Sequence, residues 1–160
     1  MDDKQLAELE QPTKIEFGWM IRRVLPEVLQ SERQSFAYPW KQEIFIEALG
    51  EQNTVGVVAT VRNTVIGFAV YELYPECLIV LNFAVLRDWR RQRIGSHIFD
   101  RLKLRLNDNR RFVRIGISEY YTEGQLFLKS MGCKCVQSIS TQSLGKTEDA
   151  LLFEYEHHKS

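Results

Sequence analysis

The sequence lacks the long hydrophobic runs and the charge imbalance that mark several classes of protein. No stretch of the 160 residues approaches the ~20 apolar residues of a membrane-spanning helix. Residues 1–14 carry four acidic residues and no apolar run, so they do not resemble the hydrophobic core of a signal peptide. Basic and acidic residues number 21 each. These absences predict a soluble, cytoplasmic protein without a membrane partner.

Cysteine is also scarce. The three cysteines, Cys77, Cys133 and Cys135, are an odd number in a chain without an export signal, which predicts free thiols in a reducing compartment. Cys133 and Cys135 have only His157 and His158 as nearby partners for a metal, and this spacing resembles no zinc pattern. We therefore predict no metal site and interpret the two cysteines as part of a strand.

Length and hydrophobic content are typical of one domain. A chain of 160 residues with 44% hydrophobic residues can fill one mixed core. The sequence has no internal repeat and no low-complexity segment. We predict a loose N-terminal extension at residues 1–14 and one domain over residues 15–160.

Hydrophobic periodicity and turn residues predict about seven strands and about four helices. The predicted strands span residues 15–23, 54–62, 65–72, 78–86, 112–118, 134–141 and 150–157, with a tight turn at Asn63-Thr64. Four helices are predicted. The first begins at Pro26 and the second ends at Gly50. The third runs from Ile94 to about Asn107, and the fourth spans about 122–131. Helices that connect strands imply parallel pairs within a mixed sheet. The expected fold class is α/β, of mixed α+β type.

Basic residues are concentrated in one part of the chain. From Arg87 to Arg114 there are ten Lys or Arg residues against three Asp residues, which predicts an anionic ligand. Nucleic acid is one candidate, but aromatic residues are sparse in this run. A compact phosphate group fits as well, and a merely solvated helix face is the third interpretation. We favour a phosphate ligand and expect no nucleic-acid partner.

The segment from Arg90 to Ser96 joins a predicted strand to a predicted helix. The first N–H groups of a helix lack partners within the helix, and the helix dipole is positive there, so such a junction binds anions. We expect the N–H groups of about residues 91–96 to bind a pyrophosphate, with added contacts from arginine side chains. Gly95 has no side chain to block the approach of a ligand. Ordinary helix capping is the alternative interpretation.

These residues resemble the GNAT superfamily of N-acetyltransferases, whose motif Q/R-x-x-G-x-G/A lies between a strand and a helix. Arg90, Ile94 and Gly95 match the motif, and Arg93 stands where the first glycine is usual. The resemblance covers nearly the whole chain and implies a single GNAT-like domain that uses acetyl-CoA. It implies that the acetyl-CoA-binding residues are Phe83, Ala84, Val85, Arg90, Arg91, Gln92, Arg93, Ile94, Gly95 and Ser96.

Two further segments resemble the RimI-like ribosomal-protein-alanine N-acetyltransferases. Residues 37–40 are similar to the aromatic F-P-W loop of that group, and residues 148–152 are similar to the E-D-A segment that opens its last strand. The resemblance implies that the acceptor is a protein or peptide N-terminal α-amine, bound by Tyr38 and Trp40. Packing of the first helices is the other possible role of Trp40. A monomer and a homodimer are equally compatible with the sequence.

The usual catalytic side chains of the family are missing. Leu128 stands where a tyrosine often protonates the leaving thiolate, and Gly116 stands where alanine acetyltransferases have a glutamate base. An α-amine with a pKa of about 7.7–8.0 depends less on a base than a lysine amine at about 10.4. Glu119 is the candidate base and Tyr121 or Tyr120 the candidate acid. A solvated glutamate and a packed tyrosine are the structural alternatives.

The expected reaction is therefore the transfer of an acetyl group from acetyl-CoA to a primary amine by direct attack, without a covalent enzyme intermediate. The sequence leaves two alternatives open. One is an acetyltransferase that acts on a small-molecule amine. The other is a non-catalytic acyl-CoA-binding module, which the absence of the usual tyrosine and glutamate would explain.

Overall fold

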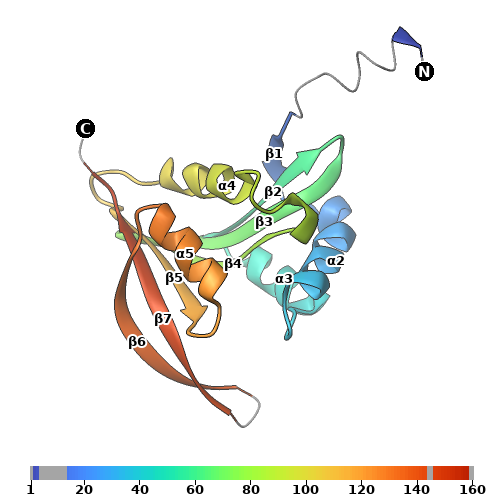
Figure 1. Ribbon diagram of the computed structural model, residues 1–160. Coiled ribbons are helices and arrows are strands. Elements are labelled where there is room, and N and C mark those ends of the chain that lie inside the picture. The colour runs from blue at the N-terminus through green and yellow to red at the C-terminus, as the bar shows by residue number, and fades with distance from the viewer. Residues whose placement is uncertain (1, 4–13, 144–145, 159–160) are drawn as a thin grey trace.

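The computed structural model describes residues 2–3, 14–143 and 146–158, so most of the predicted extension at residues 1–14 lies outside the described residues. The described residues form a seven-stranded sheet with the strand order β1-β2-β3-β4-β5-β7-β6 (Figure 1). The strands are β1 (Glu16–Trp19), β2 (Thr54–Val61), β3 (Thr64–Leu73), β4 (Cys77–Val85), β5 (Phe112–Ser118), β6 (Lys134–Ser143) and β7 (Lys146–Glu156). The helices are α2 (Leu25–Ser35), α3 (Gln42–Gly50), α4 (Ile94–Lys103) and α5 (Thr122–Ser130), with short 3-10 turns η1 (Arg22–Val24) and η2 (Arg87–Trp89). The predicted mixed fold is confirmed.

Helices cover both faces of the sheet (Figure 1). Helices α2 and α3 pack on one face through a core that includes Val28, Phe45 and Phe68. Helices α4 and α5 pack on the other face through a core that includes Ile98 and Leu128. Successive residues of the central strands are therefore buried on opposite sides, which explains the nearly continuous valine runs in the sequence.

Strands β4 and β5 form the parallel pair of the described sheet. The other neighbouring strands are antiparallel. The expectation of more than one parallel pair is therefore wrong. Strands β6 and β7 form a hairpin whose second strand pairs with β5, so β7 separates β5 from β6. As a result, α5 leads to the edge of the sheet rather than to a strand beside β5.

Several predicted boundaries also differ from the structure. The first strand, predicted over residues 15–23, ends at Trp19, because Arg22–Val24 form η1, and the last strand begins at Lys146 instead of residue 150.

The turn between β2 and β3 is made by Arg62 and Asn63, which have φ angles of 50° and 65°, and Thr64 already belongs to β3. Two successive residues with positive φ are typical of the type I′ turn, whose twist matches that of the flanking strands. The predicted turn at Asn63-Thr64 is therefore displaced by one residue.

Residues 90–93, which we call the basic turn, precede helix α4. This helix ends at Lys103, one turn before the predicted end near Asn107. The side-chain oxygen of Asn107 accepts hydrogen bonds from the N–H groups of Asn109 and Arg110 at 2.8 and 2.7 Å, which forms a local turn instead of a helix. The Arg110 guanidinium donates to the Arg105 carbonyl at 3.1 Å. Leu106 is buried, as its periodicity predicts, but it reaches the core from beyond the helix.

Candidate functional site

Strand β4 contains an extra residue at its middle. Val70 of β3 pairs with Asn82, and the next residue of β3, Tyr71, pairs with Val80. Leu81 is therefore a β-bulge, because two residues of β4 advance where β3 advances by one. Such an insertion reverses the face to which all following side chains point.

The bulge distributes the end of β4 between the two faces of the sheet. Phe83 and Val85 pack on the side of α4 and α5. Asn82 hydrogen-bonds to α2, and Ala84 belongs to the core under α2 and α3. Residues 82–85 thus contribute side chains to both faces of the sheet at the end of β4.

Strands β4 and β5 separate at the same point. Their parallel ladder runs from the pair Cys77–Phe112 to the pair Val80–Ile115. The remainder of β5, from Gly116 to Ser118, pairs with β7 on its other side. Beyond the bulge, the edge of β4 that faces β5 therefore has backbone groups available for a ligand.

A cavity of about 460 Å³ lies where the two strands separate, and we call it the main cavity. Its volume is typical of a small-molecule site. The lining consists of Ser35, Phe36, Phe83, Ala84, Val85, Trp89, Arg90, Arg91, Arg93, Ile94, Gly95, Ser96, Ile115, Ile117, Tyr121, Glu123, Gly124, Leu126, Phe127 and Leu128. Nine of the ten predicted acetyl-CoA-binding residues belong to this lining, and Gln92 does not.

The basic turn contains two residues in the left-handed conformation. Arg91 has a φ angle of 61° and Arg93, which precedes α4, has a φ angle of 65°. This conformation costs a residue with a Cβ atom roughly 1–2 kcal/mol. The backbone shape explains why glycine is usual at the position of Arg93, since glycine adopts it without that cost. Despite this strain, Arg93 contributes a basic residue to the lining of the main cavity.

Two polar side chains of the turn bind the protein itself. The Arg90 Nε atom donates to the Val85 carbonyl at 3.0 Å, which ties the turn to the end of β4. The side-chain amide of Gln92 donates to the Asp88 carbonyl at 3.1 Å. Arg90 therefore has a structural role in addition to lining the main cavity, and Gln92 stabilises the turn from outside the cavity lining.

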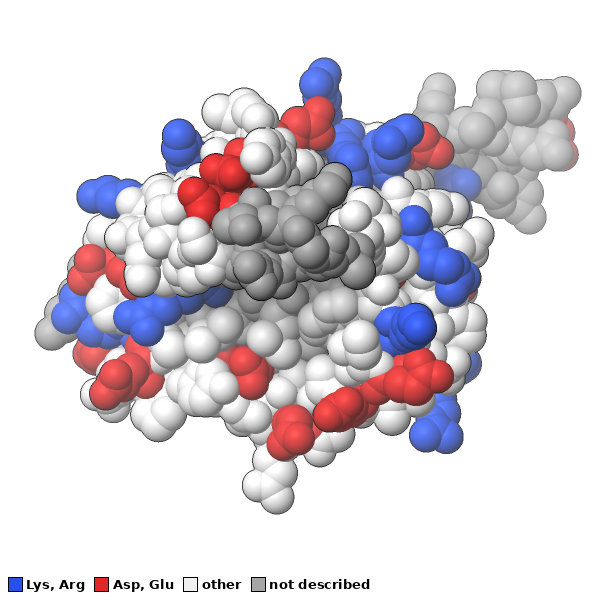
Figure 2. Space-filling view, turned by 90° about the horizontal axis from the view of Figure 1, so that it is seen from below, with Lys and Arg blue, Asp and Glu red and all other residues white. Residues whose placement is uncertain are grey.

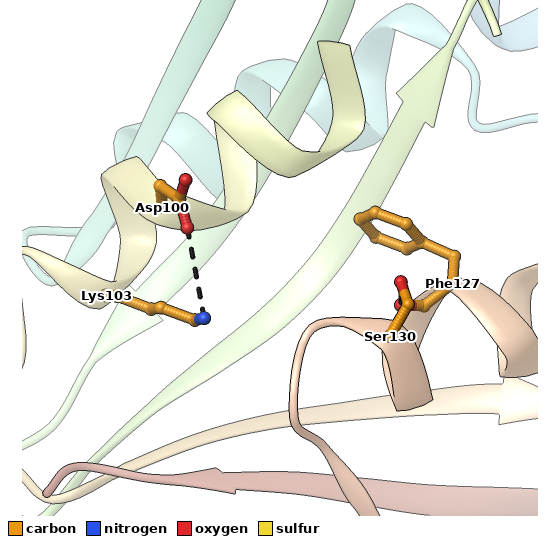
Figure 3. Close-up of polar contacts among 4 residues, drawn as sticks. All are labelled: Asp100, Lys103, Phe127 and Ser130. Atoms are coloured by element: carbon orange, nitrogen blue, oxygen red, sulfur yellow. Dashed lines mark hydrogen bonds and ion pairs between the residues drawn. The ribbon is translucent and has the colours of Figure 1, made fainter. Parts of the chain in front are cut away.

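Gly95 has a packing role that the sequence does not indicate. A Cβ atom at Gly95 would lie 3.2 Å from the ring of Phe127. Figure 3 shows this ring pointing from α5 toward α4, the helix that carries the Asp100–Lys103 ion pair, while the Ser130 hydroxyl of α5 donates to the Phe127 carbonyl. The sequence predicts that Gly95 makes room for a ligand, and in the structure its absent side chain makes room for the contact between the two helices.

The candidate acid–base residues are divided by the structure. Tyr121 lines the main cavity and is 42% exposed. Tyr120 is 73% exposed and lies outside the lining. Glu119 also lies outside the lining, where its carbonyl accepts a hydrogen bond from Gln125 at 2.8 Å. Of the three residues, only Tyr121 is thus brought together with the predicted acetyl-CoA-binding residues.

The two departures from the family pattern occupy different surroundings. Leu128 is buried and lines the main cavity. Gly116 lies between Ile115 and Ile117, which line the cavity, so alternation along β5 directs it to the opposite face. A Cβ atom at Gly116 would meet nothing within 4 Å. The position of the usual glutamate is therefore open space.

Sequence reasoning missed several lining residues. Ile115 and Ile117 line the cavity from β5, and Glu123 and Phe127 from α5. Their spacings of two residues in a strand and four residues in a helix identify shared faces. The spacing does not tell which face meets the cavity, because that depends on where β4 and β5 separate.

The predicted acceptor residues lie beside the main cavity but outside its lining. Tyr38 is 66% exposed. The Trp40 ring packs edge-on against Phe45 at a centroid distance of 5.1 Å and contacts the core under α2 and α3. Trp40 thus has the packing role that the sequence left open. Ser35 and Phe36, at the end of α2, line the cavity directly.

A buried carboxyl group connects the loop around Trp40 to β4. Glu32 is 2% exposed, and its two oxygens accept hydrogen bonds from the Trp40 N–H at 3.0 Å and the Asn82 side-chain amide at 2.8 Å. Burial raises the pKa of the Glu32 carboxyl, and the two hydrogen bonds offset part of this increase.

A model of the acetyltransferase (GNAT) family matches residues 25–121, which is more than half of the chain. The chain belongs to the GNAT acetyltransferase family. It is therefore an acetyl-CoA-dependent N-acetyltransferase with a single GNAT domain. No curated protein matches the sequence.

Solved structures of other GNAT proteins share the fold at low identity. The ribosomal-protein-S18-alanine N-acetyltransferase from Escherichia coli has a TM-score of 0.80 and 16% identity, over 92% of this chain and 96% of that chain. Arabidopsis thaliana NAA60 has a TM-score of 0.80 and 17% identity, over 92% and 100%. Ard1 from Thermoplasma volcanium has a TM-score of 0.81 and 21% identity, over 91% and 99%. These likenesses support the fold of the GNAT domain.

The main cavity fits the acetyl-CoA that GNAT enzymes bind. Arg91, Arg93 and Ser96 lie at the start of α4, where backbone N–H groups and guanidinium groups suit a pyrophosphate. Phe83 and Ile115 line an apolar part that suits pantetheine. When bound, acetyl-CoA supplies the activated acetyl group.

Neither a metal-binding cluster nor a membrane-spanning helix is found in the described part of the GNAT domain. Among these residues, no group of three or more His, Cys, Asp or Glu side chains is arranged to hold a metal ion. In the same part of the chain, every helix is too short or too polar to cross a membrane.

Replacement of Arg93 should separate the strain of the turn from its charge. Arg93→Gly should raise the free energy of unfolding by up to about 1 kcal/mol, because glycine relieves the left-handed strain. It should also weaken acetyl-CoA binding by roughly tenfold, about 1.4 kcal/mol, through loss of a guanidinium contact. Arg93→Ala is the matched control, with the same loss of affinity and no gain in stability. Calorimetric titration and thermal unfolding measure both quantities; equal stability of the two variants would contradict the assignment of strain.

The buried carboxyl of Glu32 should make stability depend on pH. Its pKa in the folded protein is raised above the unfolded value of about 4.3, so the folded state holds the proton more tightly. The free energy of unfolding should therefore fall as pH rises through the interval between the two pKa values. Glu32→Gln should remove this component, and Glu27→Gln on the same helix is the control. Urea unfolding at several pH values measures the slope; an unchanged slope in Glu32→Gln would contradict the prediction.

Proposed function

We propose that this enzyme acetylates the N-terminal α-amine of a peptide or protein. The main cavity supports this proposal because it extends from the basic turn to Ser35 and Phe36 at the end of α2. The loop with Tyr38 and Trp40 follows directly, so an acceptor entering there would meet the thioester from the side opposite the pyrophosphate. The observation that supports the proposal is that one cavity is lined both by the basic turn and by Ser35 and Phe36.

The proteins with similar structures agree with this choice of acceptor. The Escherichia coli protein is named a ribosomal-protein-S18-alanine N-acetyltransferase. Arabidopsis thaliana Naa50 was crystallised with the bisubstrate analogue CoA-Ac-MVNAL. Figure 2 views the molecule from the side where the loop after α2 and the start of α5 lie, and this face carries both acidic and basic side chains, with acidic ones in a row along its lower edge. A mixed surface of this kind favours a peptide over a nucleic acid.

The proposed reaction is a direct attack of the neutral amine nitrogen on the thioester carbonyl carbon. A C–N bond forms, the C–S bond breaks, the nitrogen loses a proton and the sulfur gains one. An α-amine with a pKa of about 7.7–8.0 is neutral in a substantial fraction of molecules near neutral pH, so the reaction tolerates the absence of a strong base. Backbone N–H groups of β4 beyond the bulge would polarise the carbonyl, and the cavity walls would align the reactants.

Tyr121 is our first choice for the proton donor to the leaving sulfur. It lines the main cavity, whereas Leu128, at the position of the usual tyrosine, has no proton to donate. Glu119 would accept the amine proton through water, since its residue lies outside the lining. Tyr120 is the second choice for the acid because it is more exposed. We assign the catalytic domain to residues 15–160.

A thiol-release screen tests the proposed acceptor. Short peptides that differ in their first residue, and a panel of polyamines, aminoglycosides and amino acids, are compared at equal acetyl-CoA concentration. We expect at least one peptide to exceed every small amine in kcat/KM by tenfold or more. The matched control is the same peptide with a blocked N-terminus and an internal lysine. Faster acetylation of a small amine than of every peptide would replace this proposal with the small-molecule alternative.

Replacement of Tyr121 tests its role in protonating sulfur. Tyr121→Phe should lower kcat about 100-fold, the lower end of the 10²–10⁴-fold range for acid–base catalysis, because the thiolate must then leave without an acid. Acetyl-CoA affinity should stay within twofold, since the ring is retained. Tyr120→Phe and Glu119→Gln are measured in parallel. A larger loss of kcat in Tyr120→Phe than in Tyr121→Phe would reverse the assignment.

Introduction of a base at Gly116 should increase activity. The open space around this position can accept a longer side chain. Gly116→Glu should raise kcat/KM at least tenfold for amines of high pKa, because a positioned base contributes about 10²–10⁴-fold. Gly116→Gln has the same size without the base and should show no gain. Equal activity of the Glu and Gln variants across a pH series would argue against an acceptor site on this side of β5.

A further inference from the structure

Glu32 is a charged residue in a place where charge is costly. It lies on α2 and is 2% exposed. Burial of a carboxylate is tolerated only when hydrogen bonds replace the lost water, and both Glu32 oxygens have such partners. An apolar side chain would fill the same space without this cost. The proposed chemistry does not use Glu32, so its presence needs another explanation.

The carboxyl group joins three segments that surround one end of the main cavity. It belongs to α2, whose last residue, Ser35, lines the cavity together with Phe36. Its Oε2 atom accepts from Asn82, which directly precedes the lining residues of β4. Its Oε1 atom accepts from the N–H of Trp40, where the loop after α2 ends. One side chain thus hydrogen-bonds both to β4 and to the loop after α2.

The loop between Phe36 and Trp40 is attached to Glu32 at both of its ends. The Phe36 N–H donates to the Glu32 carbonyl at 3.1 Å, so both ends of the loop are attached to the same residue. Tyr38, at the tip, is 66% exposed. Pro39 has no N–H to donate. The loop is therefore held at its base by Glu32, and its exposed tip is accessible to an acceptor.

We propose that Glu32 is a positioning residue that sets the acceptor end of the main cavity by bridging Trp40 and Asn82. The inference rests on the proposed entry of the acceptor past residues 36–40. Glu32 does not touch the reacting atoms. It acts by holding the loop and α2 at a fixed position relative to the end of β4, and the basic turn lies outside this bridge.

The chemistry of the bridge defines the variants. Glu32→Leu removes both acceptors and leaves the Trp40 N–H and the Asn82 amide unpaired. Asn82→Asp places a second carboxylate against Glu32. The double variant Glu32→Gln/Asn82→Asp restores the bridge with exchanged groups, because the introduced glutamine amide donates to the introduced aspartate. The oxygen of that glutamine still accepts from the Trp40 N–H.

Steady-state kinetics on the full chain provide the test, with the amine that gives the fastest thiol release. Asn82→Asp and Glu32→Leu should raise the KM for the acceptor at least tenfold and leave the Kd for acetyl-CoA within twofold. The double variant should recover the acceptor KM to within threefold of the original. Glu27→Gln is the control, since Glu27 also lies on α2 and accepts a backbone N–H, from Val65 at 2.8 Å, away from the loop.

The outcomes separate this inference from the proposed function. A preference for small amines in the unmodified enzyme would overturn the peptide acceptor, and the Glu32 series would then be measured with the preferred small amine. Equal changes in acceptor KM and acetyl-CoA Kd would overturn the positioning role. Failure of the double variant to recover would do the same. If Glu32→Leu does not fold, Asn82→Asp and the double variant still decide the question.

Discussion

Strands β4 and β5 are hydrogen-bonded from Cys77 to Val80 and then separate, and most features of the site are consequences of that separation. The bulge at Leu81 lies where the ladder ends. It turns Phe83 toward α4 and α5 and turns Asn82 toward α2. A sheet that stayed paired would have no main cavity between these strands. The two sides of the cavity that we propose for the donor and the acceptor thus both depend on one irregularity in the backbone.

The parts of the site that could be predicted from sequence are local in the chain. The turn from Arg90 to Ser96 is recognisable because a strand pattern changes to a helical period beside a cluster of arginines, and all of these signals lie within a few residues. The left-handed conformation of Arg93 does not follow from them, yet it gives the physical reason for the glycine that the family motif usually has there. Local sequence thus locates a basic turn that lines the main cavity and leaves the backbone geometry of that turn open.

The parts that could not be predicted depend on contacts between distant segments. Ile115 and Ile117 line the cavity because β5 pairs with β4 only as far as Ile115, and this point of separation is not encoded in hydrophobic alternation. The packing role of Gly95 depends on Phe127, which lies on another helix. The early end of α4 depends on Asn107 and Arg110, whose hydrogen bonds compete with a further helical turn. In each case, tertiary contacts selected one of several locally acceptable structures.

The two ends of the main cavity are built from different parts of the chain, and this division bears on specificity. The basic turn, α4 and α5 line the end that we propose for the donor, whereas Ser35 and Phe36 at the end of α2 line the end that we propose for the acceptor. Glu32 connects α2 to β4 on one face of the sheet, and Arg90 connects the turn to β4 at Val85. Because each end has its own attachment to β4, substitutions in the loop can change the acceptor while the acetyl-CoA site is retained. In the proposed reaction, strand β4 is therefore the common element against which both substrates would be aligned.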